Sequence, residues 1–272
     1  MDRALRASQC VDVVIPVYNG VETIRDALTS VLNQQGDWVH RIIVIDDGSS
    51  DNTAKLVQDI GSPLIEIVST PNQGVAKARN LGIEISAAEW IAFLDADDVW
   101  MPSKLEDQLR MAKEHNVEFV CSSVSANSLM ASCCINPQLL ARGNFVATST
   151  VLVKRSVLNR IKPVFTPGMS FAEDYLAWLK CVTLSPGYYI ADKLVDYILS
   201  ERPRYNWGLI LRNIVAINIR YASFLREINA QPMRRMGLAF ALGFGSIKSI
   251  FSICKRFIAS YRTARLKIGK VI

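Results

Sequence analysis

The sequence predicts an α/β fold with a mostly parallel central sheet flanked by helices, followed by a C-terminal amphipathic helical appendage. Short apolar runs and stretches of helical periodicity alternate four times in the first 100 residues, which implies right-handed crossovers and parallel strand pairing. Half of the 272 residues are hydrophobic, enough for a sizeable core. Beyond residue 204 the chain becomes strongly basic, which separates the appendage from the fold before it.

Short apolar runs, the first of them rich in β-branched residues, predict the strands of the first half. They cover residues 11–17, 41–45, 64–68 and 90–94. Apolar residues at helical spacing between these runs predict helices at about residues 21–34, 51–60 and 75–85. Gly48 supplies a turn before the second helix, and either Ser50 or Asp51 can cap it.

The second half has a less regular pattern. We expect helices at residues 102–115, 155–161 and 171–183, and strands at 117–122, 144–154 and 188–198, the last as one strand or two. Residues 123–142 show no clear period, so a variable loop is expected there.

Residues 205–272 are expected to form a basic amphipathic helical region. Residues 201–272 carry 14 Lys and Arg against 2 Asp and Glu, while the whole chain has a net charge of +6. A first helix is predicted by apolar residues at intervals of four and three, namely Ile210, Ile214, Ile217, Tyr221 and Phe224. A second begins near Met236. Its residues 236–254 are long enough to span a bilayer, but their polar positions favour the membrane interface. A helical hairpin packed on the first domain is the alternative.

Several protein classes are excluded by missing patterns. The six cysteines show no C-x-x-C spacing, which argues against a zinc site or a disulfide framework and fits a reducing compartment. The N-terminus has no apolar h-region, so no signal peptide is expected. Neither G-x-G-x-x-G nor a P-loop follows the first strand, which excludes a Rossmann dehydrogenase and a P-loop nucleotidase.

Three carboxylates, Asp95, Asp97 and Asp98, follow the predicted strand at residues 90–94. In open α/β sheets ligands bind outside the carboxyl ends of the strands. Carboxylates this close repel one another unless a proton or a cation intervenes, and Mg²⁺ or Mn²⁺ joined to substrate phosphates is the usual cation. A solvated acidic turn with a helix cap is the alternative for a single D-x-D motif.

Five blocks in the chain resemble, in order, the signatures of a family 2 glycosyltransferase with the GT-A fold, of the bacterial polysaccharide-biosynthesis type. The blocks are Ile15-Pro16-Val17-Tyr18-Asn19, Asp46-Asp47-Gly48-Ser49-Ser50-Asp51, Asn72-Gln73-Gly74 through Ala78-Arg79-Asn80-Leu81-Gly82, Phe93-Leu94-Asp95-Ala96-Asp97-Asp98, and Glu173-Asp174. The resemblance covers about residues 10–200. It implies a GT-A catalytic domain over residues 1–204, with a nucleotide-sugar half at about 10–100 and an acceptor half at about 101–204. Residues 123–142 would then be an acceptor-side loop.

The resemblance also implies roles for residues of these blocks. The nucleotide sugar would be bound by Pro16, Tyr18, Asn19, Asp46, Asp47, Lys77, Arg79, Asp95 and Ala96. Asp97, with Asp95, would hold Mn²⁺ or Mg²⁺, and Asp98 would help to position the loop. Asp174 would be the general base, with Glu173 orienting the acceptor or the base. Many GT-A enzymes add a late metal-ligating His, but the histidines here are His40 and His115.

Local structural roles stay open for these residues. Asp46 and Asp47 could serve only a turn and a helix cap, Arg79 could be an exposed helical arginine, and Glu173 and Asp174 could merely complement a helix dipole.

The function implied by the resemblance is inverting sugar transfer from a nucleotide diphosphate sugar, with uridine the nucleotide by family habit. The acceptor would be a saccharide or lipid-linked saccharide in cell-surface polysaccharide synthesis. Residues 205–272 would bind an anionic membrane surface, so the enzyme would be cytoplasmic and peripheral on the inner face of the cell membrane, without a nucleic-acid partner. Two alternatives stay open: a nucleotidyltransferase acting on sugar phosphates, and a non-catalytic nucleotide- or carbohydrate-binding module.

Overall fold

The computed structural model describes residues 10–128, 130–169, 172–197 and 207–228. The chain divides into two compact units. The first comprises Met1–Pro137, Val146–Met169 and Glu173–Arg202, and the second comprises Gln138–Phe145, Ser170–Ala172 and Pro203–Ile272. All the candidate site residues belong to the first unit, which is described next.

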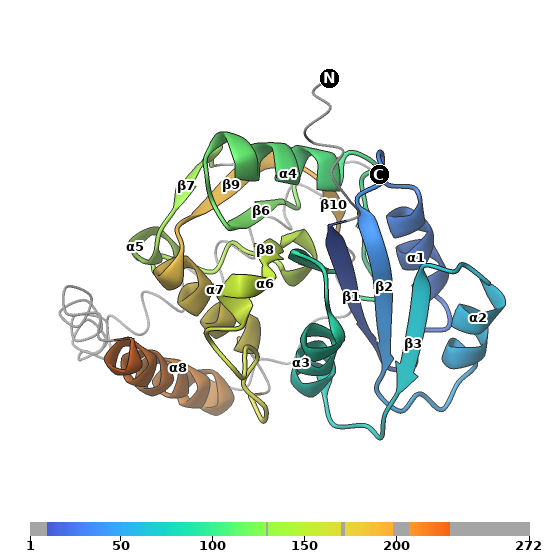
Figure 1. Cartoon of the computed structure of the whole chain (residues 1–272). Coiled ribbons are helices and arrows are strands. Elements are labelled where there is room, and N and C mark those ends of the chain that lie inside the picture. Colours follow the sequence, from blue (N-terminus) through green and yellow to red (C-terminus); the bar gives the residue numbers. More distant parts are fainter. Residues whose placement is uncertain (1–9, 129, 170–171, 198–206, 229–272) are drawn as a thin grey trace. The chain divides into compact units, whose positions relative to one another are not determined.

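The first unit is built on an eight-stranded sheet with the order β3-β2-β1-β4-β8-β6-β9-β7. These strands are β1 (Val11–Val17), β2 (Val39–Asp46), β3 (Ile65–Ser69), β4 (Trp90–Phe93), β6 (Phe119–Ser123), β7 (Cys133–Ile135), β8 (Leu152–Lys154) and β9 (Gly187–Lys193). The four strands β3, β2, β1 and β4 are all parallel, and β1 to β3 lie side by side in Figure 1. Strand β8 runs antiparallel to both β4 and β6. The predicted α/β fold with a mostly parallel sheet is therefore confirmed.

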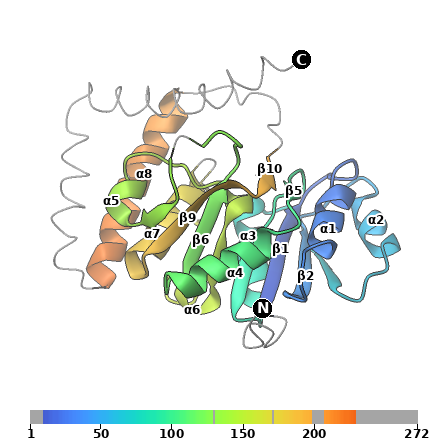
Figure 2. The same ribbon diagram turned by 90° about the horizontal axis from the view of Figure 1, so that it is seen from above.

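Helices cover both faces of the parallel half of the sheet. The helices of this unit are α1 (Ile24–Leu32), α2 (Thr53–Asp59), α3 (Val75–Ile85), α4 (Lys104–Glu114), α6 (Arg155–Leu158) and α7 (Glu173–Leu184). Alternate residues of β2 show the two layers: Ile42 and Val44 join the core cluster that contains α1, whereas Ile43 and Ile45 pack with Ala78 of α3. Figure 2 shows α4 running alongside β6.

The sequence explains the close packing of α3 on β1. All seven residues of β1 are buried, and five of them are Val or Ile, as expected for a central strand. Gly82 of α3 faces this strand, and a Cβ at that position would lie 2.3 Å from Val14 Cγ1. Glycine at residue 82 therefore allows a helix-to-strand approach that no other residue permits unless the Val14 side chain or the backbone shifts.

Three details of the second half differ from the prediction. Residues 123–142 are not a loop throughout, because β7 pairs with β9 and a short helix, α5 (Pro137–Leu140), follows it. The strand expected over residues 144–154 is restricted to β8, because residues 148–150 form a 3-10 turn, η2. A two-stranded sheet of β5 (Val99–Trp100) and β10 (Val195–Asp196) was not predicted. These strands are too short to show a period, and pairing with distant segments stabilises them.

In the second unit, α8 (Trp207–Glu227) confirms the first helix predicted for the appendage. The second predicted helix, from about Met236, lies outside the described residues, as does the segment 236–254. Among the residues that the structure describes, no helix combines the length and the hydropathy required to cross a bilayer.

Candidate functional site

Acidic residues lie at the carboxyl ends of two parallel strands, β2 and β4, which flank β1 in the sheet. Asp46 ends β2, and Asp95 follows β4 after one residue. Strand β1 lies between β2 and β4, so the order of connection reverses on either side of it. This is the topological switch point at which open α/β sheets bind ligands. Tyr18, directly after β1, lies at the same edge with 54% of its surface exposed.

Arg79 connects two parts of the predicted site. It is buried on α3, with 5% of its surface exposed, so the alternative of an exposed helical arginine is wrong. Its Nη2 donates a hydrogen bond to Asp95 Oδ1 at 2.6 Å, and its Nη1 donates to Glu173 Oε1 at 3.2 Å. Its guanidinium carbon lies 5.3 Å from the ring centroid of Phe165, whose backbone is held by the side chain of Asn80. One buried cation thus joins the loop after β4 to the start of α7.

Asp174 is the second residue of α7, beside Glu173. Burial and the neighbouring Glu173 charge raise the pKa of Asp174 to about 6, although the Arg79 guanidinium opposes the shift. Its Oδ1 accepts a hydrogen bond from the Tyr175 N–H at 2.6 Å. A carboxylate with a pKa near 6 is ionised at neutral pH and still basic enough to accept a proton, which is the property a general base needs.

Asp97 lies in the loop after β4 and is half-buried. Burial, followed by the charge of Asp95, raises its pKa. The carboxylate oxygens of Asp95 and Asp97 are suitable ligands for Mg²⁺ or Mn²⁺, which take their other ligands from phosphates and water. Among the described residues no group of three His, Cys, Asp or Glu side chains is placed to hold a metal ion, so a third side-chain ligand is not supplied there.

Asp46 and Asp47 stabilise the turns at the sheet edge. The two carboxylate oxygens of Asp47 accept hydrogen bonds from the backbone N–H groups of Gln73 and Gly74, at 2.8 and 2.7 Å. Asp46 is buried and accepts a hydrogen bond within its own turn. Gly48 has a φ of +80°, and a Cβ there would lie 2.8 Å from a backbone nitrogen of the 70–74 loop. Asp47 therefore holds the two loops together, and Asp46 stabilises its own turn.

The remaining predicted residues lie around these loops. Pro16 is buried in β1, and Ala96 is half-buried between Asp95 and Asp97. The side-chain oxygen of Asn19 accepts a hydrogen bond from the Ser50 N–H at 2.8 Å. Lys77 is exposed, and its Nζ donates to Gln73 Oε1 at 3.0 Å. Lys77 thus contacts the 72–74 loop, whereas Arg79 contacts the carboxylates.

Comparisons with known proteins give the family. Residues 12–134 match the family model described as glycosyl transferase family 2. The UDP-Glc:alpha-D-GlcNAc-diphosphoundecaprenol beta-1,3-glucosyltransferase WfgD of Escherichia coli is 31% identical over 179 residues, which cover 62% of this chain and 68% of that protein. The chain belongs to glycosyl transferase family 2. The putative teichuronic acid biosynthesis glycosyltransferase TuaG of Bacillus subtilis is 30% identical over 185 residues, covering 62% of this chain and 70% of that protein.

Solved structures share the fold of this glycosyltransferase. The S. aureus TarS 1–349 structure superposes with a TM-score of 0.64 at 19% identity, covering 77% of this chain and 64% of that chain. The mannosyltransferase PcManGT from Pyrobaculum calidifontis, in complex with GDP-Man and Mn²⁺, gives a TM-score of 0.61 at 19% identity and covers 94% of this chain and 82% of that chain. The GT-A fold expected from the sequence is confirmed. Family membership also sets aside the nucleotidyltransferase and the non-catalytic module.

The 3-10 turn η2 (Thr148–Thr150) was not predicted from the sequence. Ser149 in this turn is fully buried, and its Oγ accepts a hydrogen bond from the Asp95 N–H at 3.0 Å. The Oγ1 of Thr148 lies 3.5 Å from Asp174 Oδ2. The turn therefore borders both the loop of residues 94–98, which carries the D-x-D motif (the D-x-D loop), and Asp174, the candidate base of the glycosyltransferase. Its hydroxyl residues gave no signal because they fell within a segment whose alternation predicted a strand.

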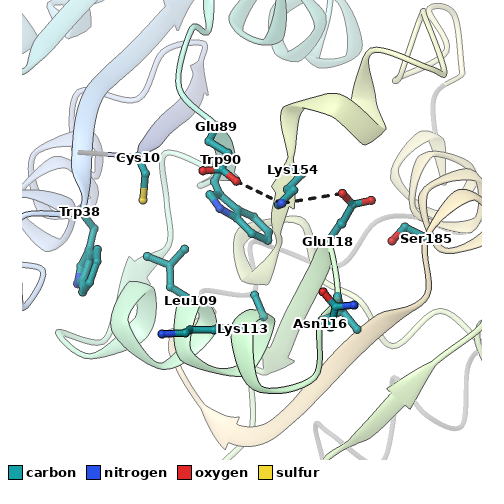
Figure 3. Close-up of a pocket in the computed structure, with 12 residues that line it drawn as sticks. Cys10, Trp38, Glu89, Trp90, Leu109, Lys113, Asn116, Glu118, Lys154 and Ser185 are labelled. Carbon is teal, nitrogen blue, oxygen red and sulfur yellow. Dashed lines mark ion pairs between the residues drawn. The ribbon is translucent and has the colours of Figure 1, made fainter. Parts of the chain in front are cut away.

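A cavity of about 580 Å³ lies away from these residues, beside the starts of β1 and β4. Figure 3 shows Lys154 between two carboxylates at its wall, with Nζ 3.2 Å from Glu89 and 4.0 Å from Glu118. Its lining includes Trp38 and Trp90 but none of the predicted site residues. The carboxyl ends of the parallel strands, and not this cavity, are therefore the place to seek the glycosyltransferase site.

Proposed function

We propose that this glycosyltransferase moves a sugar, with inversion at the anomeric carbon, from a UDP-linked donor to a lipid-linked saccharide, with Asp174 as the general base. The observation that carries the proposal is the double ion pair of Arg79. One guanidinium group thus binds both Asp95, which follows β4, and Glu173. Asp95 belongs to the proposed donor site, and Glu173 is adjacent to Asp174. Donor and acceptor chemistry would then take place within one contiguous site.

Inversion by direct displacement needs a base on the face opposite the leaving group. In the proposed reaction, the proton of the acceptor hydroxyl passes to Asp174 as the hydroxyl oxygen bonds to the anomeric carbon. The bond between that carbon and the diphosphate oxygen breaks, and its electrons stay with the UDP leaving group. The raised pKa of Asp174, about 6, suits this role at neutral pH. Glu173, fixed by Arg79, would orient the base.

Asp97, with Asp95, would hold the divalent cation. The fit rests on the donor set: both are carboxylates of one loop, and burial and their mutual charge disfavour the ionised form of Asp97 in the absence of a cation. The cation would neutralise charge on the departing diphosphate. Arg79 already occupies Asp95 Oδ1, so Asp97 would be the principal protein ligand.

The names of two relatives support the donor and acceptor classes. WfgD and WfaP of Escherichia coli are both described as UDP-Glc:alpha-D-GlcNAc-diphosphoundecaprenol beta-1,3-glucosyltransferases, and WfaP is 28% identical over 90% of this chain. We propose that Tyr18, Pro16 and Asn19 border the nucleotide base and that the loop held by Asp47 completes its pocket. The exposed ring of Tyr18 at the switch point supports this placement.

The test is transfer from UDP-sugars to an undecaprenyl-diphosphate-linked GlcNAc in the presence of Mn²⁺. Asp174→Asn is expected to lower the rate of transfer by about 10²- to 10⁴-fold, the usual contribution of general base catalysis, while UDP affinity stays near normal. Asp59→Asn, at an exposed position that ends α2, is the matched control and should keep the wild-type rate. Retained turnover in Asp174→Asn would exclude Asp174 as the base.

We further propose that residues 205–272 form one domain that binds an anionic membrane surface, where a lipid-linked acceptor would reside. Each Lys or Arg near such a surface contributes about 1 kcal/mol, and this region is strongly basic. In α8, Val215 and Ile219 lie one helical turn apart and are 56% and 62% exposed. Flotation with anionic and neutral vesicles tests the idea: the full chain should float only with anionic vesicles. A truncation after Arg204 that still floats would refute it.

A further inference from the structure

We propose that Ser149 is a positioning residue that sets the conformation of the D-x-D loop and thereby the binding of the donor diphosphate and its cation. The inference rests on the proposed role of Asp95 and Asp97 in donor binding. It concerns a residue outside the five signature blocks, 51 residues or more from its partners in the chain.

Ser149 makes two hydrogen bonds with the D-x-D loop through a single hydroxyl group. Its Oγ accepts from the Asp95 N–H at 3.0 Å and donates to Asp98 Oδ2 at 2.5 Å. The loop is closed by a third bond, from the Asp98 N–H to the Asp95 carbonyl at 3.1 Å. Asp97 therefore lies between two residues that are both anchored to Ser149. A change in that anchor would move the carboxylate of Asp97.

The backbone of the turn that carries Ser149 is itself held in place by hydrogen bonds to its carbonyl groups. The indole Nε1 of Trp100 donates to the Ser149 carbonyl at 2.8 Å. In the same turn, the Thr150 carbonyl accepts a hydrogen bond from Gln108 Nε2 at 2.7 Å, and Lys104 donates to the other end of that amide. The turn is thus anchored to β5 and α4, so its hydroxyl offers the loop a fixed partner.

The hydrogen bond from Ser149 to Asp98 is important because Asp98 is a buried acidic residue. Asp98 is almost fully buried, and a buried carboxylate keeps its charge only with donors directed at it. A hydroxyl that donates to a carboxylate forms a short and strong charge-assisted bond. Replacing Ser149 with Ala removes a donor from Asp98 and an acceptor from the Asp95 N–H. The loss of these two hydrogen bonds favours a change in the conformation of the loop.

UDP binding, which requires no turnover, tests the proposal by isothermal titration of the full chain with and without Mn²⁺. Ser149→Ala should weaken UDP binding in Mn²⁺ by about tenfold, the effect of one charge-assisted hydrogen bond. It should also raise the Mn²⁺ concentration for half-maximal binding. Thr150→Val is the matched control, because Thr150 is equally buried in the same turn but its hydroxyl donates to Ala147 O. The control should lose thermal stability and keep the wild-type UDP affinity.

A double-mutant cycle with Asp98→Asn tests whether Ser149 affects UDP binding through Asp98. If Ser149 acts through Asp98, Ser149→Ala should add little to the loss of UDP affinity in Asp98→Asn, whereas independent effects would add. Ser149→Cys keeps the size of the side chain but is a poor hydrogen-bond donor, and it is titrated with the same expectation if Ser149→Ala does not fold.

Asp97→Asn distinguishes a failure of the positioning role of Ser149 from a failure of the proposed donor site. If Asp97→Asn weakens Mn²⁺-dependent UDP binding but Ser149→Ala does not, Ser149 is not a positioning residue and the proposed site stands. An equal loss in Ser149→Ala and Thr150→Val would likewise refute a positioning role. If Asp97→Asn binds UDP and Mn²⁺ like the wild type, the proposed donor site is wrong and the inference falls with it.

Discussion

Replacing the candidate base should make the protein more stable while it removes activity. The pKa of Asp174 is about 6 in the folded chain, against an ordinary value of 3.8. Between these values the folded state keeps a proton that the unfolded state releases, so stability falls as the pH rises from about 4 to about 6. A shift of about two pKa units corresponds to at most about 3 kcal/mol above pH 7. Asp174→Asn carries no such charge and should recover most of this free energy.

Urea denaturation of the wild type and Asp174→Asn at pH 4.5, 6 and 8 measures the effect. We expect the variant to be more stable by about 1–3 kcal/mol at pH 8, with the difference shrinking toward pH 4.5 because both side chains are then mostly neutral. The same variant should transfer sugar about 10²- to 10⁴-fold more slowly, as expected where an active site retains an unfavourable charge. A variant that is less stable at pH 8, or a gain in stability that does not depend on pH, would contradict a destabilising charge on buried Asp174.

Three further outcomes can be measured. Arg79→Met should lower the free energy of unfolding in urea by about 3 kcal/mol, because it leaves two paired carboxylates without their cation. It should also move the acid limb of the kcat/KM profile to higher pH, since Arg79 lowers the pKa of Asp174. Gly82→Ala should cost about 1–3 kcal/mol by overpacking against Val14, as a lowered Tm would show. Asp97→Asn should keep the wild-type Tm but raise the Mn²⁺ concentration required for half-maximal transfer, because the metal ligand is lost and the fold is not.

The parallel half of the fold could be predicted because each of its elements carries a local pattern. The predicted bounds of the first strand and the third helix agree with β1 and α3, since apolar runs and helical spacing extend over their whole length. The antiparallel half could not be predicted as well. Strands β5, β7 and β8 have two or three residues each, and their pairing partners lie far away in the sequence. Tertiary pairing, which no local pattern encodes, fixes their conformation.

The site could be predicted where residue type alone restricts the chemistry. Clustered carboxylates after β4 are such a case, and the loop-positioning role expected for Asp98 agrees with its hydrogen bond to Ser149. Arg79 is a case in which residue type does not reveal the partners of the side chain. Its position on a helix does not reveal that residues 16 and 94 positions away in the chain supply its partners, Asp95 and Glu173. Ser149 could not be found at all from the sequence, because a serine in an apparent strand has no distinguishing feature.

The arrangement of charge gives a physical reason for the proposed dependence of the reaction on a divalent cation. Asp95, Asp97, Glu173 and Asp174 share the site, and the guanidinium of Arg79 is paired with two of them. Arg79 opposes the rise in the pKa of Asp174 only in part, and the pKa values of both Asp97 and Asp174 remain raised. A nucleotide diphosphate would add further negative charge to this edge of the sheet. Unless a divalent cation accompanies it, diphosphate binding would have to be coupled to protonation of these carboxylates, and a protonated Asp174 cannot act as a base. If Asp97 held a divalent cation, as proposed, the cation would offset the diphosphate charge, and Asp174 could stay ionised for the acceptor hydroxyl.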